Sequence, residues 1–277
     1  RRISSTIKLI TSVFTGSKRI ANCLCTALRS PCTGSITLVG SGLFSILLVL
    51  ARTPGLNDWF PVADFFRVAL VVHVDLSVAV WFAAMAGMLW SLNSTARAEG
   101  LSWVALGLCI GGTVLMSLAA FVDPGTPVMA NYIPVLDGTL FLFGLAAFGV
   151  GFALQVVRGL WAARSVGRAL GGAGALRFGL HASLVSAAVA LIAFAWSLAV
   201  VPRSLDARAY YEILFWGGGH ALQFVWTLLM LVGWLALAQA SGARVPLSPR
   251  LALLMFALAL ASVFVTPYAY LAHDVAT

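Results

Sequence analysis

Seven long apolar runs determine what this chain can fold into. They cover about 36–51, 68–92, 101–122, 139–157, 180–201, 213–238 and 251–272. A helix needs on the order of 20 apolar residues to cross a bilayer, and it satisfies its own backbone hydrogen bonds in lipid. Strands of a membrane barrel would alternate apolar with polar residues instead. The runs therefore predict an all-α, polytopic membrane bundle of about seven transmembrane helices, of which the first run is the shortest.

The composition excludes two broad classes of protein. With 61% hydrophobic and only 9% charged residues, the chain cannot be a soluble globular domain. A net charge of +8 could attract nucleic acid, but the clustered basic and aromatic face that such binding needs is absent. We therefore expect membrane lipid, and no nucleic acid, as a partner.

The basic residues predict how the spans are oriented. They gather before the first run and after the second, fourth and sixth runs, at Arg1, Arg2, Lys8, Lys18, Arg19, Arg29, Arg97, Arg158, Arg164, Arg168, Arg177, Arg244 and Arg250. The alternate loops carry fewer arginines and most of the acidic residues. Lys and Arg in short loops are retained on the cytoplasmic side. We expect a multi-pass protein of the bacterial inner (cytoplasmic) membrane with a cytoplasmic N-terminus.

Residues 1–34 differ in character from residues 35–277. The first segment is rich in Ser, Thr, Arg and Cys, and we interpret it as a tail, with a weak interfacial helix or a non-native sequence as open alternatives. Its cysteines, Cys23, Cys25 and Cys32, do not have the spacing of a zinc site and are expected to be free thiols. The second segment forms one membrane domain.

Three of the four histidines are predicted to lie in one layer near the outer face. His73 lies about five residues into the second run and His220 about seven into the sixth, so both lie roughly 8–11 Å deep. His273, about 22 residues along the antiparallel seventh run, returns to the same face. His181, at the start of the fifth run, is expected at the opposite interface.

An imidazole inside a membrane is costly unless it binds something, because hydrocarbon offers no partner to a polar group. His220 follows Gly217, Gly218 and Gly219, which would let a bulky group approach the helix. We therefore predict that His220 and His73 ligate a metal or haem. The alternative for each is a hydrogen bond between helices, and the glycines could equally serve helix packing.

Around His220, the run Phe215–Trp216–x–x–Gly219–His220 resembles the sixth span of the catalytic subunit I of haem–copper oxygen reductases and the related nitric oxide reductases. The resemblance covers roughly residues 36–277. It implies that His220 and His273 bind copper, that His73 is an axial ligand of a low-spin haem of b or a type, and that Tyr270 is a candidate redox tyrosine. It further implies reduction of oxygen or nitric oxide with electrons from cytochrome c or quinol, alongside other oxidase subunits.

The sequence departs from that family at several points. The paired histidines of the seventh span become His273–Asp274, so the copper site has changed. Ala221–Leu–Gln–Phe224 replaces the glutamate and tyrosine that follow the sixth-span histidine in common oxygen reductases. The family's remaining haem ligands lie on a tenth span, which this chain does not reach. We thus expect an N-terminal seven-span portion that is inactive alone.

Two other functions remain open. In a non-catalytic haem b membrane anchor, His73 and His220 would face each other and ligate one haem. In a transporter or receptor-type bundle, the histidines would be structural and no cofactor would bind. A retinal protein is excluded, because its Schiff base needs a lysine within a span and the only lysines are Lys8 and Lys18.

Overall fold

The structure, a computed structural model, describes residues 20–56, 59–60, 64–167, 172–243 and 247–273, with side chains from residue 34 onward. Within these ranges seven helical spans are long and apolar enough to cross a membrane, so the predicted all-α membrane bundle is confirmed. The chain is a multi-pass membrane protein. Its elements are α2 (Ile20–Ala51), α3 (Phe65–Val74), η2 (Asp75–Val80), α4 (Trp81–Leu92), α5 (Glu99–Val122), β1 (Thr126–Val128), β2 (Val135–Asp137), α6 (Thr139–Ala162), α7 (Gly172–Val200), α8 (Ala207–Ala240), α9 (Pro249–Val263) and α10 (Val265–Ala272).

Some helices begin earlier than the apolar runs predict. α2 is already helical at Ile20, so residues 20–34 form the first part of this helix. α7 begins at Gly172 and α8 at Ala207, several residues before their apolar runs. Hydropathy marks only the hydrocarbon-spanning part, whereas a helix can continue into the interface where charged residues are solvated.

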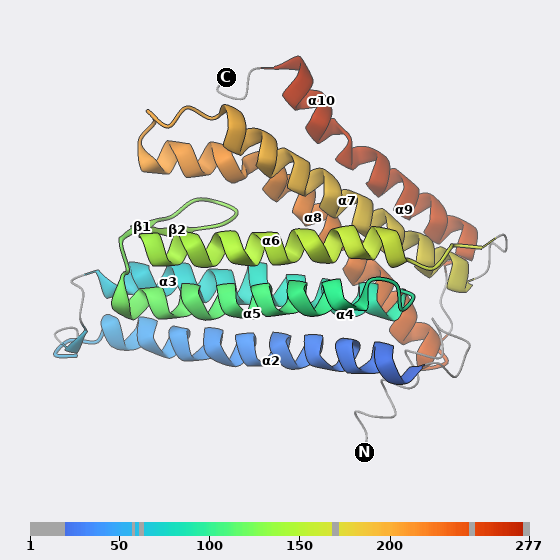
Figure 1. Cartoon of the computed structure of the whole chain (residues 1–277), viewed down its shortest axis with the longest axis horizontal. Coiled ribbons are helices and arrows are strands. Elements are labelled where there is room, and N and C mark those ends of the chain that lie inside the picture. The colour runs from blue at the N-terminus through green and yellow to red at the C-terminus, as the bar shows by residue number, and fades with distance from the viewer. Residues whose placement is uncertain (1–19, 57–58, 61–63, 168–171, 244–246, 274–277) are drawn as a thin grey trace.

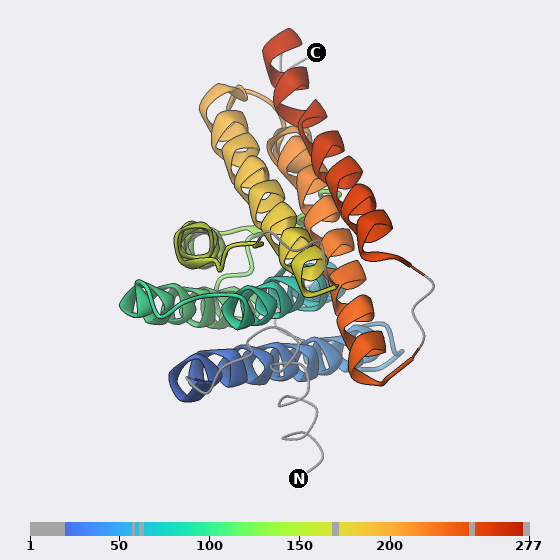
Figure 2. The same ribbon diagram turned by 90° about the vertical axis from the view of Figure 1, so that its right-hand side faces the viewer.

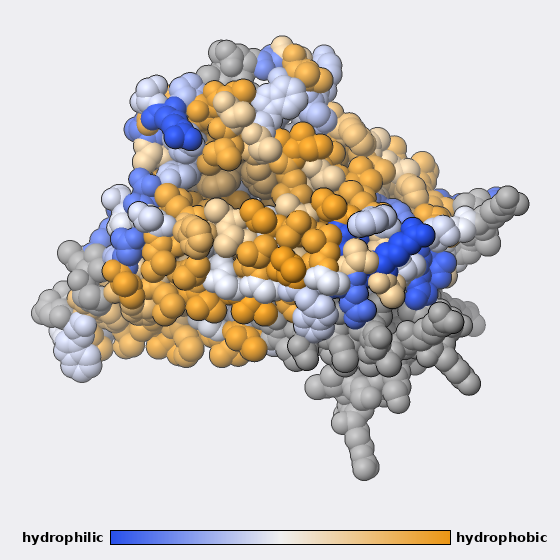
Figure 3. Space-filling view, in the orientation of Figure 1, coloured by the Kyte–Doolittle hydropathy of each residue, from blue (hydrophilic) through white to orange (hydrophobic). Residues whose placement is uncertain are grey.

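The spans form two groups that cross each other. α2, α3 to α4, α5 and α6 run nearly parallel, while α7, α8 and α9 lie at an incline to them (Figures 1 and 2). α4 also contacts α8, where Phe82 stacks on Trp226 at 5.4 Å between ring centroids. An apolar belt covers the middle of the face in Figure 3 and polar residues lie toward its two ends, as expected of a protein surrounded by lipid.

A short β-hairpin marks one end of the bundle. β1 and β2 pair antiparallel between α5 and α6, with Thr126 opposite Asp137 (Figure 1). Gly125 has a φ of +56°, and a Cβ there would overlap Asp137, so the turn into the hairpin requires glycine. We call this the hairpin end.

The opposite end, which we call the basic end, is closed by hydrogen bonds between two loops. The backbone of Thr95 donates to Ala162, and that of Arg164 donates to Asn93. Arg158, which is only 4% exposed, donates to the Ser94 hydroxyl at 2.9 Å and to the Thr95 carbonyl at 3.0 Å. The Arg158 guanidinium thus fastens the α4–α5 loop to α6.

Candidate functional site

His73 is held in place by the neighbouring helix α2. Its Nδ1 lies 2.9 Å from the backbone oxygen of Ser41 and 3.0 Å from the Ser41 hydroxyl. A carbonyl can only accept, so Nδ1 carries the proton and donates to Ser41. The Ser41 hydroxyl in turn donates to the His73 carbonyl at 3.2 Å. In the neutral imidazole, these contacts select the tautomer with its proton on Nδ1.

That tautomer leaves the other nitrogen of His73 available. Nε2 carries a lone pair, and no residue in the described ranges hydrogen-bonds to it. The side chain is half-buried, so the nitrogen is not sealed inside the bundle. Histidines that bind a metal or haem usually donate their second N–H to a carbonyl or carboxylate, which orients the ring. His73 fits an axial haem ligand on this criterion.

Asp75 is an unusual group that the site prediction missed. It opens η2, a turn of π-helix, and is 1% exposed. Neither carboxylate oxygen hydrogen-bonds to any residue in the part of the chain that the structure describes. π-turns within α-helices occur frequently at functional sites, and an ionisable residue in a span is a functional candidate by default. Its position inside the second apolar run was the signal that could have found it.

His220 lies on α8 and contacts the hairpin loop. Its Nδ1 is 2.9 Å from the carbonyl of Trp216, one turn earlier, and so donates to it. The hydroxyl of Tyr132 lies 2.9 Å from Nδ1 and 3.0 Å from Nε2. Because Nδ1 already donates to the Trp216 carbonyl, the hydroxyl donates to Nε2. Burial, and then the charge of Glu212, raise the pKa of Tyr132, so the hydroxyl keeps its proton at neutral pH. Both ring nitrogens of His220 are thus hydrogen-bonded, and the Tyr132 hydroxyl occupies the Nε2 lone pair that a metal ion would need.

The three glycines before His220 are explained by aromatic packing. A Cβ on Gly217 would overlap the ring of Tyr270, one on Gly218 the ring of Phe194, and one on Gly219 the ring of Tyr132. Each glycine admits a different ring against the α8 backbone. The close approach that the sequence predicted is real, but side chains of this protein make it.

Tyr270 and His273 lie at the end of the seventh span. The hydroxyl of Tyr270 is 2.7 Å from that of Ser197, and the residue is buried against α8. This is a packing position, and a redox role for Tyr270 stays a prediction. His273 ends α10 and is exposed, with its backbone N–H donating to Ala269 at 3.0 Å. Asp274, which follows it, lies outside the described residues.

The histidines are not assembled into one centre. His73 hydrogen-bonds to α2, whereas His220 hydrogen-bonds to the hairpin loop. In the described part of the chain, no three His, Cys, Asp or Glu side chains form a group that could hold a metal. His181 donates from Nδ1 to the Arg177 carbonyl, 2.7 Å away in its own helix.

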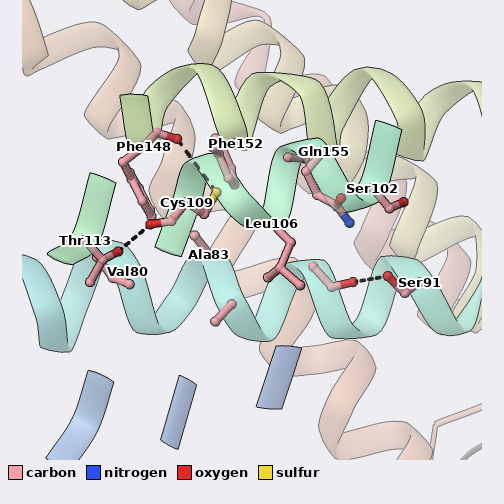
Figure 4. A pocket seen from close by; sticks show the side chains of 13 residues that line it. Val80, Ala83, Ser91, Ser102, Leu106, Cys109, Thr113, Phe148, Phe152 and Gln155 are labelled. Atoms are coloured by element: carbon pink, nitrogen blue, oxygen red, sulfur yellow. Dashed lines mark hydrogen bonds between the residues drawn. The ribbon is translucent and has the colours of Figure 1, made fainter. Parts of the chain in front are cut away.

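A narrow pocket lies between α4, α5 and α6 (Figure 4). Its volume is about 50 Å³, enough for a few water molecules, since one needs roughly 10–15 Å³ by this measure. Ser102 and Gln155 lie at one end, and the buried Ser102 hydroxyl has no hydrogen-bond partner among the described residues. Cys109 and Thr113, toward the other end, bond to backbone carbonyls at 3.8 and 2.7 Å. Water is the occupant that this size and polarity fit.

Comparison with known proteins gives relatives but no function. No protein-family model matches the chain, and no solved structure matches it. An uncharacterized protein of Rickettsia prowazekii is 26% identical over 246 residues, covering 76% of this chain and 46% of that protein. An uncharacterized protein of Aquifex aeolicus is 28% identical over 202 residues, covering 73% of this chain and 50% of that protein. The chain spans about half the length of these curated relatives.

Proposed function

We propose that this chain is the haem-binding membrane portion of a redox protein, with His73 as an axial ligand of a low-spin haem. The observation that carries the proposal is the hydrogen bond from His73 Nδ1 to the Ser41 carbonyl at 2.9 Å, which orients the ring and leaves Nε2 without a hydrogen-bond partner among the described residues. A bound haem would supply one-electron chemistry. The chain supplies the nitrogen donor, its orientation and an apolar surrounding.

The wider proposal is a haem–copper oxidase-like subunit I that reduces oxygen or nitric oxide. Its electrons would come from cytochrome c or quinol, and other oxidase subunits would be partners. The copper part has weaker support than the haem part, because Tyr132 engages Nε2 of His220. Copper binding by His220 and His273 requires the Tyr132 hydroxyl to leave that nitrogen.

The proposed location is the bacterial inner membrane, with the basic end and the N-terminus in the cytoplasm. Arg97, Arg158, Arg164 and Arg177 belong to loops or helix ends at the basic end. The hairpin end carries Arg52, Arg67, Arg203 and Arg208, whose charges are offset by Asp64, Asp123, Asp137, Asp206 and Glu212. This asymmetry follows the retention of basic residues on the cytoplasmic side.

Haem binding by single-histidine variants tests the proposal. The purified chain is titrated with haem b, and the Soret band and haem content are measured for wild type, His73→Leu and His181→Leu. His181 is a matched control, because its Nδ1 also faces a carbonyl, within its own helix. We expect His73→Leu to lose most of the bound haem and His181→Leu to keep it. Equal haem content in both variants would refute His73 as a ligand.

A further inference from the structure

A large cavity lies between α4, α6, α7 and α8. Its volume is about 600 Å³, within the range of roughly 300–1,000 Å³ typical of small-molecule sites. α6 and α7 touch near the basic end, where Gly159 lies against Leu184, and diverge toward the hairpin end (Figures 1 and 2). Val150 on α6 and Leu198 on α7, which both line the cavity, are 53% and 57% exposed. The cavity therefore opens sideways to lipid, and a ligand could enter from the bilayer.

Aromatic side chains make up much of the cavity wall. They are Phe148, Phe152, Phe194, Tyr210, Tyr211, Phe215 and Trp226. Phe194 meets Phe215 edge to face at 6.0 Å between centroids, and Phe152 lies 6.4 Å from Trp226. Aromatic rings pack best against other flat rings in offset or edge-to-face arrangements. A flexible acyl chain would also be buried here, but it would not use these ring–ring arrangements.

The polar groups of the cavity further restrict the ligand. None of the described residues that line the cavity is a histidine, cysteine, methionine or acid, so this wall offers no imidazole, thiolate or thioether ligand for a haem. The wall contains two tyrosines, Tyr210 and Tyr211, on the side nearer the hairpin end. Tyr211 donates to Asp137 at 2.9 Å, while the Tyr210 hydroxyl bonds to no residue in the described ranges and can donate to a ligand. The site therefore suits a flat, apolar ring that carries a hydrogen-bond acceptor.

We propose that this cavity binds the ring of a lipid-soluble quinone. A quinone carbonyl would accept a hydrogen bond from Tyr210, and the quinone ring would pack against the aromatic wall. The quinone tail could leave between α6 and α7 into the bilayer. The inference deepens the proposed function, in which quinol is one of two electron donors. It does not need the haem, because the residues that line the cavity are separate from His73 and Ser41.

Binding of decylubiquinone to the purified chain in nanodiscs tests the inference. Quenching of tryptophan fluorescence reports binding, since Trp226 lines the cavity. Gly149→Phe fills the cavity without strain, because a Cβ at Gly149 meets nothing within 4 Å. Gly111→Phe is the matched control, being equally open but outside the cavity. We expect saturable binding in wild type and Gly111→Phe, and at least tenfold weaker binding in Gly149→Phe.

Two more variants and one competitor complete the test. Ala195→Phe fills the cavity from α7 and replaces Gly149→Phe if that variant does not fold. Tyr210→Phe should weaken binding about fivefold, the effect of one hydrogen bond worth about 1 kcal/mol. Equal quenching in cavity-filling and control variants would refute the site, and equal competition by dodecanol would refute the preference for a ring. His73→Leu should bind decylubiquinone normally, because His73 does not line the cavity. Failure of the wild-type chain to bind haem would therefore refute the haem proposal alone.

Discussion

Replacing Asp75 by leucine should stabilise the protein. Asp75 is 1% exposed, and both its carboxylate oxygens lack a hydrogen-bond partner among the described residues. Moving Asp to the centre of a transmembrane helix costs about 2.5–3.5 kcal/mol, whereas leucine is favourable there by about 0.5 kcal/mol. Leucine has the same branching as aspartate but is larger, and crowding in a packed interior costs about 1–3 kcal/mol. We therefore expect a net gain of about 1–2 kcal/mol in the free energy of unfolding.

Equilibrium unfolding in mixed micelles, followed by circular dichroism, measures this gain. Ser77→Ala is a suitable control, because Ser77 lies in the same π-turn and its hydroxyl bonds to its own helix, 2.8 Å from the His73 carbonyl. That variant should change the free energy of unfolding by less than about 1 kcal/mol. A clear loss of stability in Asp75→Leu would refute the reasoning, because it would show that the carboxylate makes a favourable interaction.

Three further predictions concern packing, metal and orientation. Gly219→Ala should lower the free energy of unfolding by about 1–3 kcal/mol, because its Cβ overlaps the ring of Tyr132. In the same assay Gly233→Ala, which has open space around its Cβ, should leave the free energy of unfolding unchanged or raise it by up to about 1 kcal/mol. If copper binds, elemental analysis should find about one copper per chain, and His220→Ala should remove it; full copper in that variant would exclude His220 as a ligand. In a cysteine-free background, a cysteine at the exposed Thr126, next to Gly125, should react with an impermeant thiol reagent from outside, and one at Gly172 should not. The reverse pattern would overturn the proposed orientation.

The sequence predicted the spans well because hydrophobic length is a local property. Each apolar run became a helix, and the span from 101 to 122 needed only two added residues at its start to match α5 at Glu99–Val122. Helix ends were less accurate, since α8 continues back through Glu212 and Arg208 to a cap at Asp206, which accepts from two backbone N–H groups. Local capping and interfacial solvation decide such ends, and hydropathy records neither.

The site could be predicted only in part, because ligand geometry depends on contacts between distant segments. The position of His73 within a span was evident, but its Ser41 partner is 32 residues away on another helix. The partner of His220 is Tyr132, 88 residues earlier in a hairpin that hydropathy gives no sign of. Gly217 to Gly219 were correctly interpreted as sites of close approach, but the sequence could not show that the approaching groups are rings of the same chain.

Chemical rescue of His73→Gly tests the central claim most directly. If the His73 imidazole is an axial ligand, this variant should lose the haem absorption of the wild-type protein. Free imidazole, which supplies the same nitrogen donor, should then restore it in a saturable manner. The glycine itself costs only about 1 kcal/mol of helix stability, so the fold should persist. A His73→Gly protein that keeps the wild-type haem spectrum without added imidazole would contradict the account.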